Sequence, residues 1–106
     1  MLKNLTAANI YIVCGHTDMR KSIDGLAAIV SQQFKLNLFS DSLFLFCGRR
    51  RDRLKALLWE GDGFIMLYKR LENGRFNWPR NVDIPLSEFP SQVHWASGIS
   101  MNCLTF

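Results

Sequence analysis

Guanidinium and aromatic side chains are concentrated in the middle third of this chain, between Arg49 and Arg80. Nine of the thirteen basic residues lie in that stretch, together with only four acidic residues. The whole-chain excess of +4 therefore originates in one segment. Charge gathered in this way attracts a polyanion more strongly than the same charge scattered over the surface. Nucleic acid is the first candidate for that polyanion.

The densest part of this segment is the run Arg49–Arg51, which directly follows Gly48 at the end of an apolar stretch. Arginine suits phosphate because its planar fork donates two parallel hydrogen bonds and stays charged. On a strand that begins at Arg53, we expect Arg53 and Lys55 to share one face, which Lys69 on the next strand extends. A solvated surface loop beside acidic neighbours is the competing interpretation. The predicted DNA-binding residues are Arg49, Arg50, Arg51, Arg53, Lys55, Lys69, Arg70, Arg75, Arg80 and Trp78, with a secondary contact from Arg20 and Lys21.

Aromatic residues lie among these cations. Aromatic side chains on a sheet can stack unpaired bases, but they are also common core residues of a small domain. Trp78 is predicted to be the exposed one, because Asn77, Pro79 and Arg80 around it are typical of a strand edge. The aromatic residues considered for stacking are Trp59, Tyr68, Phe76 and Trp78.

The residues support metal binding and nuclease activity less than they support polyanion binding. Cys14 and His16 form one close pair, whereas a structural zinc site usually has four ligands in paired short spacings. A two-metal nuclease needs several acids that converge on one pocket, and the candidates here fit helix starts and turns. We therefore predict no catalytic residue, no metal and no cofactor. The carboxylates considered are Asp18, Asp24, Asp52 and Asp62.

Several elements must position these side chains. Ile10–Cys14 and Leu43–Cys47 are apolar runs that predict buried strands. Apolar residues at helical spacing predict a helix over about Ser22–Lys35. An antiparallel meander is expected to follow, with Asn73-Gly74 as a strong hairpin signal before its last strand. Its strands are Arg53–Glu60, Phe64–Arg70 and Arg75–Trp78.

The predicted fold class is α+β, a mainly antiparallel sheet of about five strands with one main helix packed on one face. Leu86–Trp95 is predicted to form a short C-terminal helix or an irregular tail, and Ala96–Phe106 to be loosely ordered. The 106 residues suit one domain. Without an apolar run long enough to span a bilayer, and with three well-separated cysteines, the chain is expected to be cytoplasmic.

Taken in order, several blocks of the chain resemble a known family, the accessory protein encoded by the second reading frame of insertion sequences of the sixty-six type. The resemblance covers about residues 10–80, and the tail matches less well. The blocks that carry it are Thr17-Asp18-Met19-Arg20-Lys21, Arg49-Arg50-Arg51-Asp52-Arg53, Trp59-Glu60-Gly61-Asp62-Gly63 and Tyr68-Lys69-Arg70-Leu71-Glu72.

This resemblance implies a role in DNA transposition beside a separate, larger transposase that carries the catalytic residues. The expected partners are the duplex ends of the element, the transposase and another accessory protein of the same element. A homodimer through a sheet edge at Arg75–Trp78 is a further possibility. The alternative is a protein-interaction subunit that docks the transposase without touching DNA. A metal-dependent nuclease is the third hypothesis.

Overall fold

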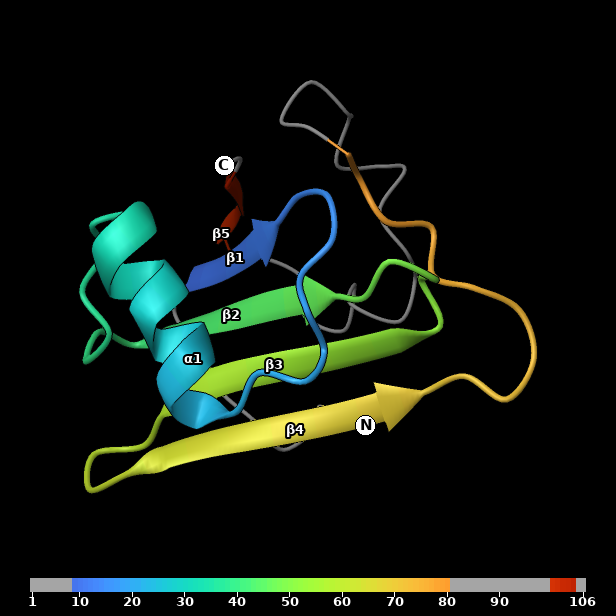
Figure 1. The fold of residues 1–106 in the computed structure, drawn as a ribbon. Helices are drawn as coiled ribbons and strands as arrows, with labels where there is room; N and C mark the ends of the chain where they lie inside the picture. The colour runs from blue at the N-terminus through green and yellow to red at the C-terminus, as the bar shows by residue number, and fades with distance from the viewer. Residues whose placement is uncertain (1–8, 81–99, 105–106) are drawn as a thin grey trace.

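The computed structural model describes residues 9–80 and 100–104, which form one mixed sheet and a helical segment (Figure 1). Its strand order is β4-β3-β2-β1-β5. β2, β3 and β4 pair antiparallel, whereas β1 pairs parallel with both β2 and β5. The strands are β1 (Asn9–Val13), β2 (Ser42–Cys47), β3 (Arg53–Trp59), β4 (Phe64–Arg70) and β5 (Ser100–Leu104).

The α+β class is confirmed, but the prediction of a mainly antiparallel sheet is wrong. The chain passes from β1 to β2 through a helix, and such a crossover lets the two strands run in the same direction. The predicted loose order of the last residues is also wrong at Ser100–Leu104, because this segment forms β5 beside β1. The predicted helix at Leu86–Trp95 lies outside the described residues.

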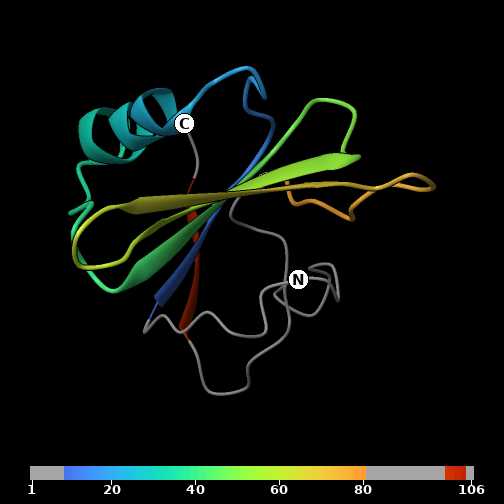
Figure 2. The same ribbon diagram turned by 90° about the horizontal axis from the view of Figure 1, so that it is seen from below.

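The helical segment comprises α1 (Ile23–Ala28) and a π-helical continuation, η1 (Ile29–Gln33). The predicted helix over about Ser22–Lys35 is therefore confirmed. It lies on one face of the sheet, as Figure 2 shows edge-on. Leu26, Ile29 and Val30 are its buried residues and pack against Phe44 and Phe46 of β2. In the described parts of the chain, no helix is long and apolar enough to cross a bilayer.

The opposite face of the sheet has its own hydrophobic cluster, which includes Phe76 and Trp78 from the segment after β4. Trp78 is only 4% exposed, and its indole Nε1 donates a 2.9 Å hydrogen bond to the carbonyl of Val13. The predictions of an exposed Trp78 and of a strand at Arg75–Trp78 are both wrong. The segment instead crosses the sheet and, among the described strands, forms no edge. Within the described sheet, β4 is an outer strand.

β2 is covered on both faces, since all six of its residues are buried. Leu43 and Leu45 belong to the cluster with Trp78, while Phe44 and Phe46 belong to the cluster with the helix. Because β1 and β2 are parallel, their carboxyl ends meet at one edge of the sheet, which is where ligands bind in open α/β sheets. The loops that leave these two strands carry the residues considered next.

Candidate functional site

The arginine turn, Gly48–Asp52, connects β2 to β3 in a fixed conformation. The amide of Gly48 donates to the carbonyl of Arg53 at 3.0 Å, and the amide of Arg51 donates to the carbonyl of Gly48 at 3.0 Å. Arg51 adopts the left-handed region, with φ 61°. In so short a connection, Arg49 and Arg50 have no neighbouring strand to cover them, and both side chains are exposed.

Residues that follow β4 hold this turn from a second side. The amide of Leu71 donates to the carbonyl of Asp52 at 2.7 Å, and the amide of Phe76 donates to the carbonyl of Arg51 at 2.6 Å. Phe76 is itself anchored in the core. The backbone that carries the arginines is therefore tied to the buried part of the fold, which reduces the conformational entropy that a binding partner would have to remove.

The loop from Cys14 to Ser22 lies beside the arginine turn. The amide of Thr17 donates to the carbonyl of Cys47 at 2.8 Å, which joins this loop to the end of β2. Near its start, the amide of Gly15 donates to the carbonyl of Pro79 at 2.9 Å. These bonds bring two of the blocks singled out in the sequence, one at Thr17 and one at Arg49, to the same edge of the sheet.

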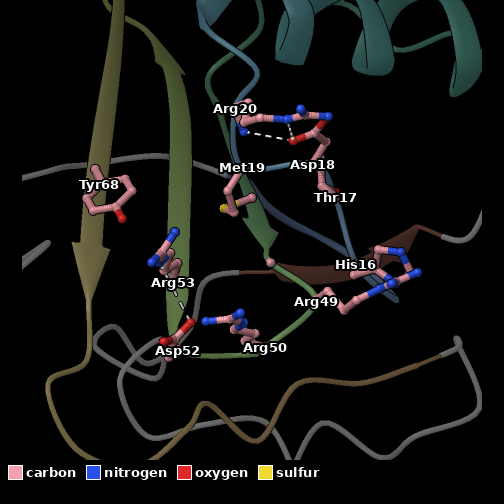
Figure 3. A pocket seen from close by; sticks show the side chains of 11 residues that line it. His16, Thr17, Asp18, Met19, Arg20, Arg49, Arg50, Asp52, Arg53 and Tyr68 are labelled. Atoms are coloured by element: carbon pink, nitrogen blue, oxygen red, sulfur yellow. Dashed lines mark hydrogen bonds and ion pairs between the residues drawn. The ribbon is translucent and has the colours of Figure 1, made fainter.

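Between the two loops lies a hollow of about 920 Å³, shown in Figure 3. Its wall combines four arginines, two carboxylates, an imidazole, a threonine hydroxyl and a tyrosine ring. A smaller hollow of about 230 Å³ lies next to it, where Arg51 and Arg80 are also found. The larger hollow is lined by His16, Thr17, Asp18, Met19, Arg20, Gly48, Arg49, Arg50, Asp52, Arg53 and Tyr68.

Charge at the wall is only partly neutralised. Arg20 pairs with Asp18, with Nη2 2.8 Å from Oδ2, and this contact holds the pKa of the Asp18 carboxyl well below its usual range. Arg53 lies 3.9 Å from Asp52, measured from Nε to Oδ1. Among the described residues, neither Arg49 nor Arg50 has an ion-pair partner. The hollow therefore offers cations that a bound anion could neutralise.

Two buried polar atoms at the wall have no hydrogen-bond partner within the described part of the chain. They are Oγ1 of Thr17 and Nε of Arg53. An unpaired polar group costs about 1–3 kcal/mol when it is buried, so most are satisfied in folded proteins. Both unpaired atoms belong to residues that line the same hollow. A ligand with oxygen acceptors would remove this cost once side chains at the wall moved to expose the two atoms.

Tyr68 supplies the aromatic part of the wall, and its side chain is 49% exposed. It stands on β4 directly opposite Lys55 of β3. Lys55 is only 8% exposed, because its ammonium donates a 2.8 Å hydrogen bond to the carbonyl of Lys21 and lies 5.8 Å from the centre of the Tyr68 ring. Lys55 thus supports the ring and is itself shielded from solvent.

The structure brings together some of the residues predicted to bind DNA and separates others. Arg20, Arg49, Arg50 and Arg53 line the larger hollow. The predicted basic face of Arg53, Lys55 and Lys69 is wrong, since Lys69 pairs with Leu54 in the register and so points to the opposite side. Outside this hollow, the side chain of Lys21 is exposed, Arg70 pairs with Glu72 at 3.0 Å, and Arg75 is exposed after the end of β4.

Sequence reasoning did not single out Thr17 as a functional residue, and for Tyr68 it left open both a stacking role and a place in the core. The signal for Tyr68 was present, because it follows Met66 and Phe64 on one strand face and precedes Arg70. For Thr17, the sequence contains no comparable signal of a functional role. Of the four candidate carboxylates, Asp18 and Asp52 line the hollow, while Asp24 lies in α1. Residues 9–80 and 100–104 contain no cluster of metal-ligating side chains.

Gly48 has little room for a side chain, because a Cβ at this position would lie 2.7 Å from Cγ of Met19. We expect Gly48→Ala to lower the free energy of unfolding by roughly 1–2 kcal/mol, as for other overpacked sites. Denaturant titration measures this. Adding Met19→Ala removes the obstructing atoms, so the double variant should be more stable than the sum of the single effects implies. Simple additivity would contradict the contact.

Cys47, the last residue of β2, is fully buried, and burial raises the pKa of its thiol from 9.0 to about 12. Between pH 9.0 and about 12, the Cys47 thiol is deprotonated in the unfolded chain but still protonated in the native chain. The free energy of unfolding should therefore fall as pH rises from 9.0 towards 12, by up to about 1.4 kcal/mol per pH unit. Urea titrations across this range should show a shallower fall for Cys47→Ala, and an equal slope would contradict the assignment.

The sequence of this chain is similar to one protein family and to two proteins of known sequence. The family model described as "IS66 Orf2 like protein" matches residues 8–102. The protein y4hO of Sinorhizobium fredii is 37% identical over 100 residues, which cover 93% of this chain and 87% of the relative. The protein y4jC of the same organism is 31% identical over 83 residues, which cover 78% and 71% respectively. Both carry the description "uncharacterized". No solved structure matches the chain.

Proposed function

The chain belongs to the IS66 Orf2-like family, and from this membership we propose that it is a non-enzymatic accessory subunit for transposition of an insertion sequence. In this role it binds the duplex ends of the element through phosphates. It assists a separate catalytic transposase and works with another accessory protein of the same element. Family membership supports the role in transposition, and the direct contact with DNA is an additional proposal based on the arginine turn.

The observation that carries this proposal is the arginine turn. Arg49 and Arg50 are exposed, and neither is neutralised by an ion pair within the described residues. The backbone beneath them is held by hydrogen bonds from Leu71 and Phe76. Arginines on a pre-positioned backbone bind phosphate well, because the guanidinium fork matches phosphate oxygens and little order has to be created on binding.

A specific feature favours the second candidate, a subunit that docks a protein partner. Phe39, Trp59 and Phe64 form an aromatic cluster where β3 ends and β4 begins, with ring centres 4.8 Å apart for Phe39 and Trp59. Phe39 is 60% exposed. Exposed aromatic groups are typical of protein interfaces. This cluster lies at the opposite end of β3 from the arginine turn, so it is compatible with DNA at the other end.

The experiment that tests the proposal is a salt titration of binding to the terminal duplex of the element, with a scrambled duplex and the matching single strand for comparison. Three arginine–phosphate contacts should give a slope of about −3 for log affinity against log salt. A preference for the terminal duplex would indicate recognition of the ends. Equal affinity for both duplexes would indicate a phosphate binder that takes its specificity from the transposase. If DNA is not bound even at low salt, the protein-docking role replaces this one.

A further inference from the structure

We propose that the larger hollow binds one unpaired nucleotide of a DNA strand, with its phosphate at the arginine turn and its base against Tyr68. This inference rests on the proposed function and deepens it, because it specifies what part of the DNA enters the protein. It implies that the chain distinguishes a strand end or an unstacked nucleotide from continuous duplex.

The size of the hollow supports a single nucleotide. Its volume of about 920 Å³ falls within the roughly 300–1,000 Å³ of pockets that enclose small ligands. A base-paired duplex is far too wide to enter it, so a duplex can only rest on the rim. An unpaired nucleotide can be inserted and stacked. The hollow is therefore larger than phosphate contacts on a duplex would require.

The phosphate end is defined by unsatisfied hydrogen-bonding groups. Nε of Arg53 and Oγ1 of Thr17 are buried and have no hydrogen-bond partner among the described residues, although Nε also lies 3.9 Å from the Asp52 carboxylate. Both residues line the hollow with Arg50. Because both atoms are shielded from solvent, side chains at the wall must shift before a phosphate can reach them. Guanidinium and hydroxyl groups both serve as phosphate donors in DNA complexes. The Asp18 carboxylate is already engaged by Arg20, which limits its repulsion of an anion.

The base end is defined by Tyr68. This ring is half exposed and is supported by Lys55, which leaves it available as a stacking surface. In the sheet register, Lys55 is opposite Tyr68, so Arg53 is the diagonal neighbour of the ring on the same face. Diagonal neighbours are roughly 7–8 Å apart, which is comparable to the span of one nucleotide from phosphate to base. The Tyr68 ring and the Arg53 guanidinium are thus spaced to contact the base and the phosphate of one nucleotide.

Affinity for a short labelled single strand and for a hairpin of the same composition, whose stem is fully paired and whose loop is a non-nucleotide linker, tests the base end. Tyr68→Leu should weaken binding of the single strand by about tenfold or more, while binding of the hairpin changes less than about twofold. Tyr68→Phe, which keeps the ring, should bind both as the wild type does. Phe39→Leu is the matched control, since it removes another exposed aromatic ring at the far end of the sheet. Thermal melting confirms that each variant is folded.

The phosphate end has its own pair of variants. Thr17→Val keeps the side-chain volume but lacks the hydroxyl, so we expect several-fold weaker binding of the single strand, whereas Thr17→Ser should retain affinity. Wild-type affinity in Thr17→Val would overturn the placement of the phosphate. An equal loss of affinity for strand and hairpin in Tyr68→Leu, or no loss for either, would overturn the placement of the base.

If the wild type binds duplex in a salt-dependent way but does not bind the single strand, this inference fails and the proposed function stands. If it binds neither, both fail.

Discussion

A variant in which Ala replaces both Arg49 and Arg50 is expected to bind duplex DNA roughly 10–100-fold more weakly than the wild-type chain. In the proposed complex each arginine would supply one charged contact to phosphate, and each such contact releases counterions when it forms. The slope of log affinity against log salt should therefore become shallower by about 1.8. The loss should be similar for the terminal and scrambled duplexes, because phosphate contacts carry no direct sequence information.

The control for this variant is a single charge removed elsewhere. Lys35 is exposed and follows η1, so Lys35→Gln changes net charge as much as Arg50→Ala does. Arg50→Ala should weaken binding clearly, while Lys35→Gln should have little effect. Equal effects of the two would mean that net charge attracts the DNA and the turn has no special part. Unaltered affinity of the double variant would remove the arginine turn from the mechanism.

The largest effect on stability is expected for Trp78→Ala, at about 3–5 kcal/mol of unfolding free energy. Trp78 is buried on the face of the sheet opposite the helix, and its indole donates to the carbonyl of Val13. Removing the ring leaves a large cavity and also deletes this hydrogen bond. Because a domain of this size has only about 5–15 kcal/mol of stability, the loss should be a large share of the total. Urea titration and thermal melting measure it.

Replacement by Phe separates the two contributions. Trp78→Phe keeps most of the apolar packing and loses the hydrogen bond, so a smaller loss of about 1–2 kcal/mol is expected. Trp59→Phe is the matched control, because Trp59 is only partly buried and sits at the other end of the sheet. It should change stability by less than Trp78→Phe does. A Trp78→Ala variant that melts like the wild type would show that residues 71–80 do not pack on the sheet.

The elements with strong local signals were predictable from the sequence. The apolar runs at Ile10–Cys14 and Leu43–Cys47 end at glycines, and they form β1 and β2 within a residue of the expected bounds. The helical repeat of apolar residues also reports the face that packs on the sheet. In these segments, local pattern and tertiary packing favour the same structure, so one is a good guide to the other.

The segment Arg75–Trp78 shows where pattern reasoning fails. Phe76 and Trp78 are buried while Arg75 and Asn77 are exposed, so the alternation typical of a strand is present. Alternation reports which side chains are covered, and it does not report whether the backbone is paired with a neighbouring strand. Here residues 75–78 cross the face of the sheet and pair with none of the described strands. That distinction depends on contacts with Val13 and Arg51, which are distant in sequence.

The candidate site was predictable in its chemistry and only partly in its geometry. Arg49, Arg50 and Arg53 meet at one hollow, as their proximity in sequence indicates. Lys69 is excluded by the register of β3 and β4, which the intervening turn sets and which cannot be read from either strand alone. Thr17 is brought in by the parallel pairing of β1 and β2, a long-range contact. Residue types thus indicated what the site could bind, and the topology decided which residues share it.

The buried thiol of Cys47 has a practical consequence for studying the arginine turn that follows it. A thiol-reactive reagent reaches this fully buried side chain only when the end of β2 opens, so the labelling rate under native conditions counts local opening events. In a chain whose other two cysteines are replaced, that rate reports on the base of the turn without altering any arginine. A DNA strand that holds the turn closed should slow the labelling. The labelling rate of Cys47, the residue directly before the turn, would therefore report whether DNA is bound at the turn.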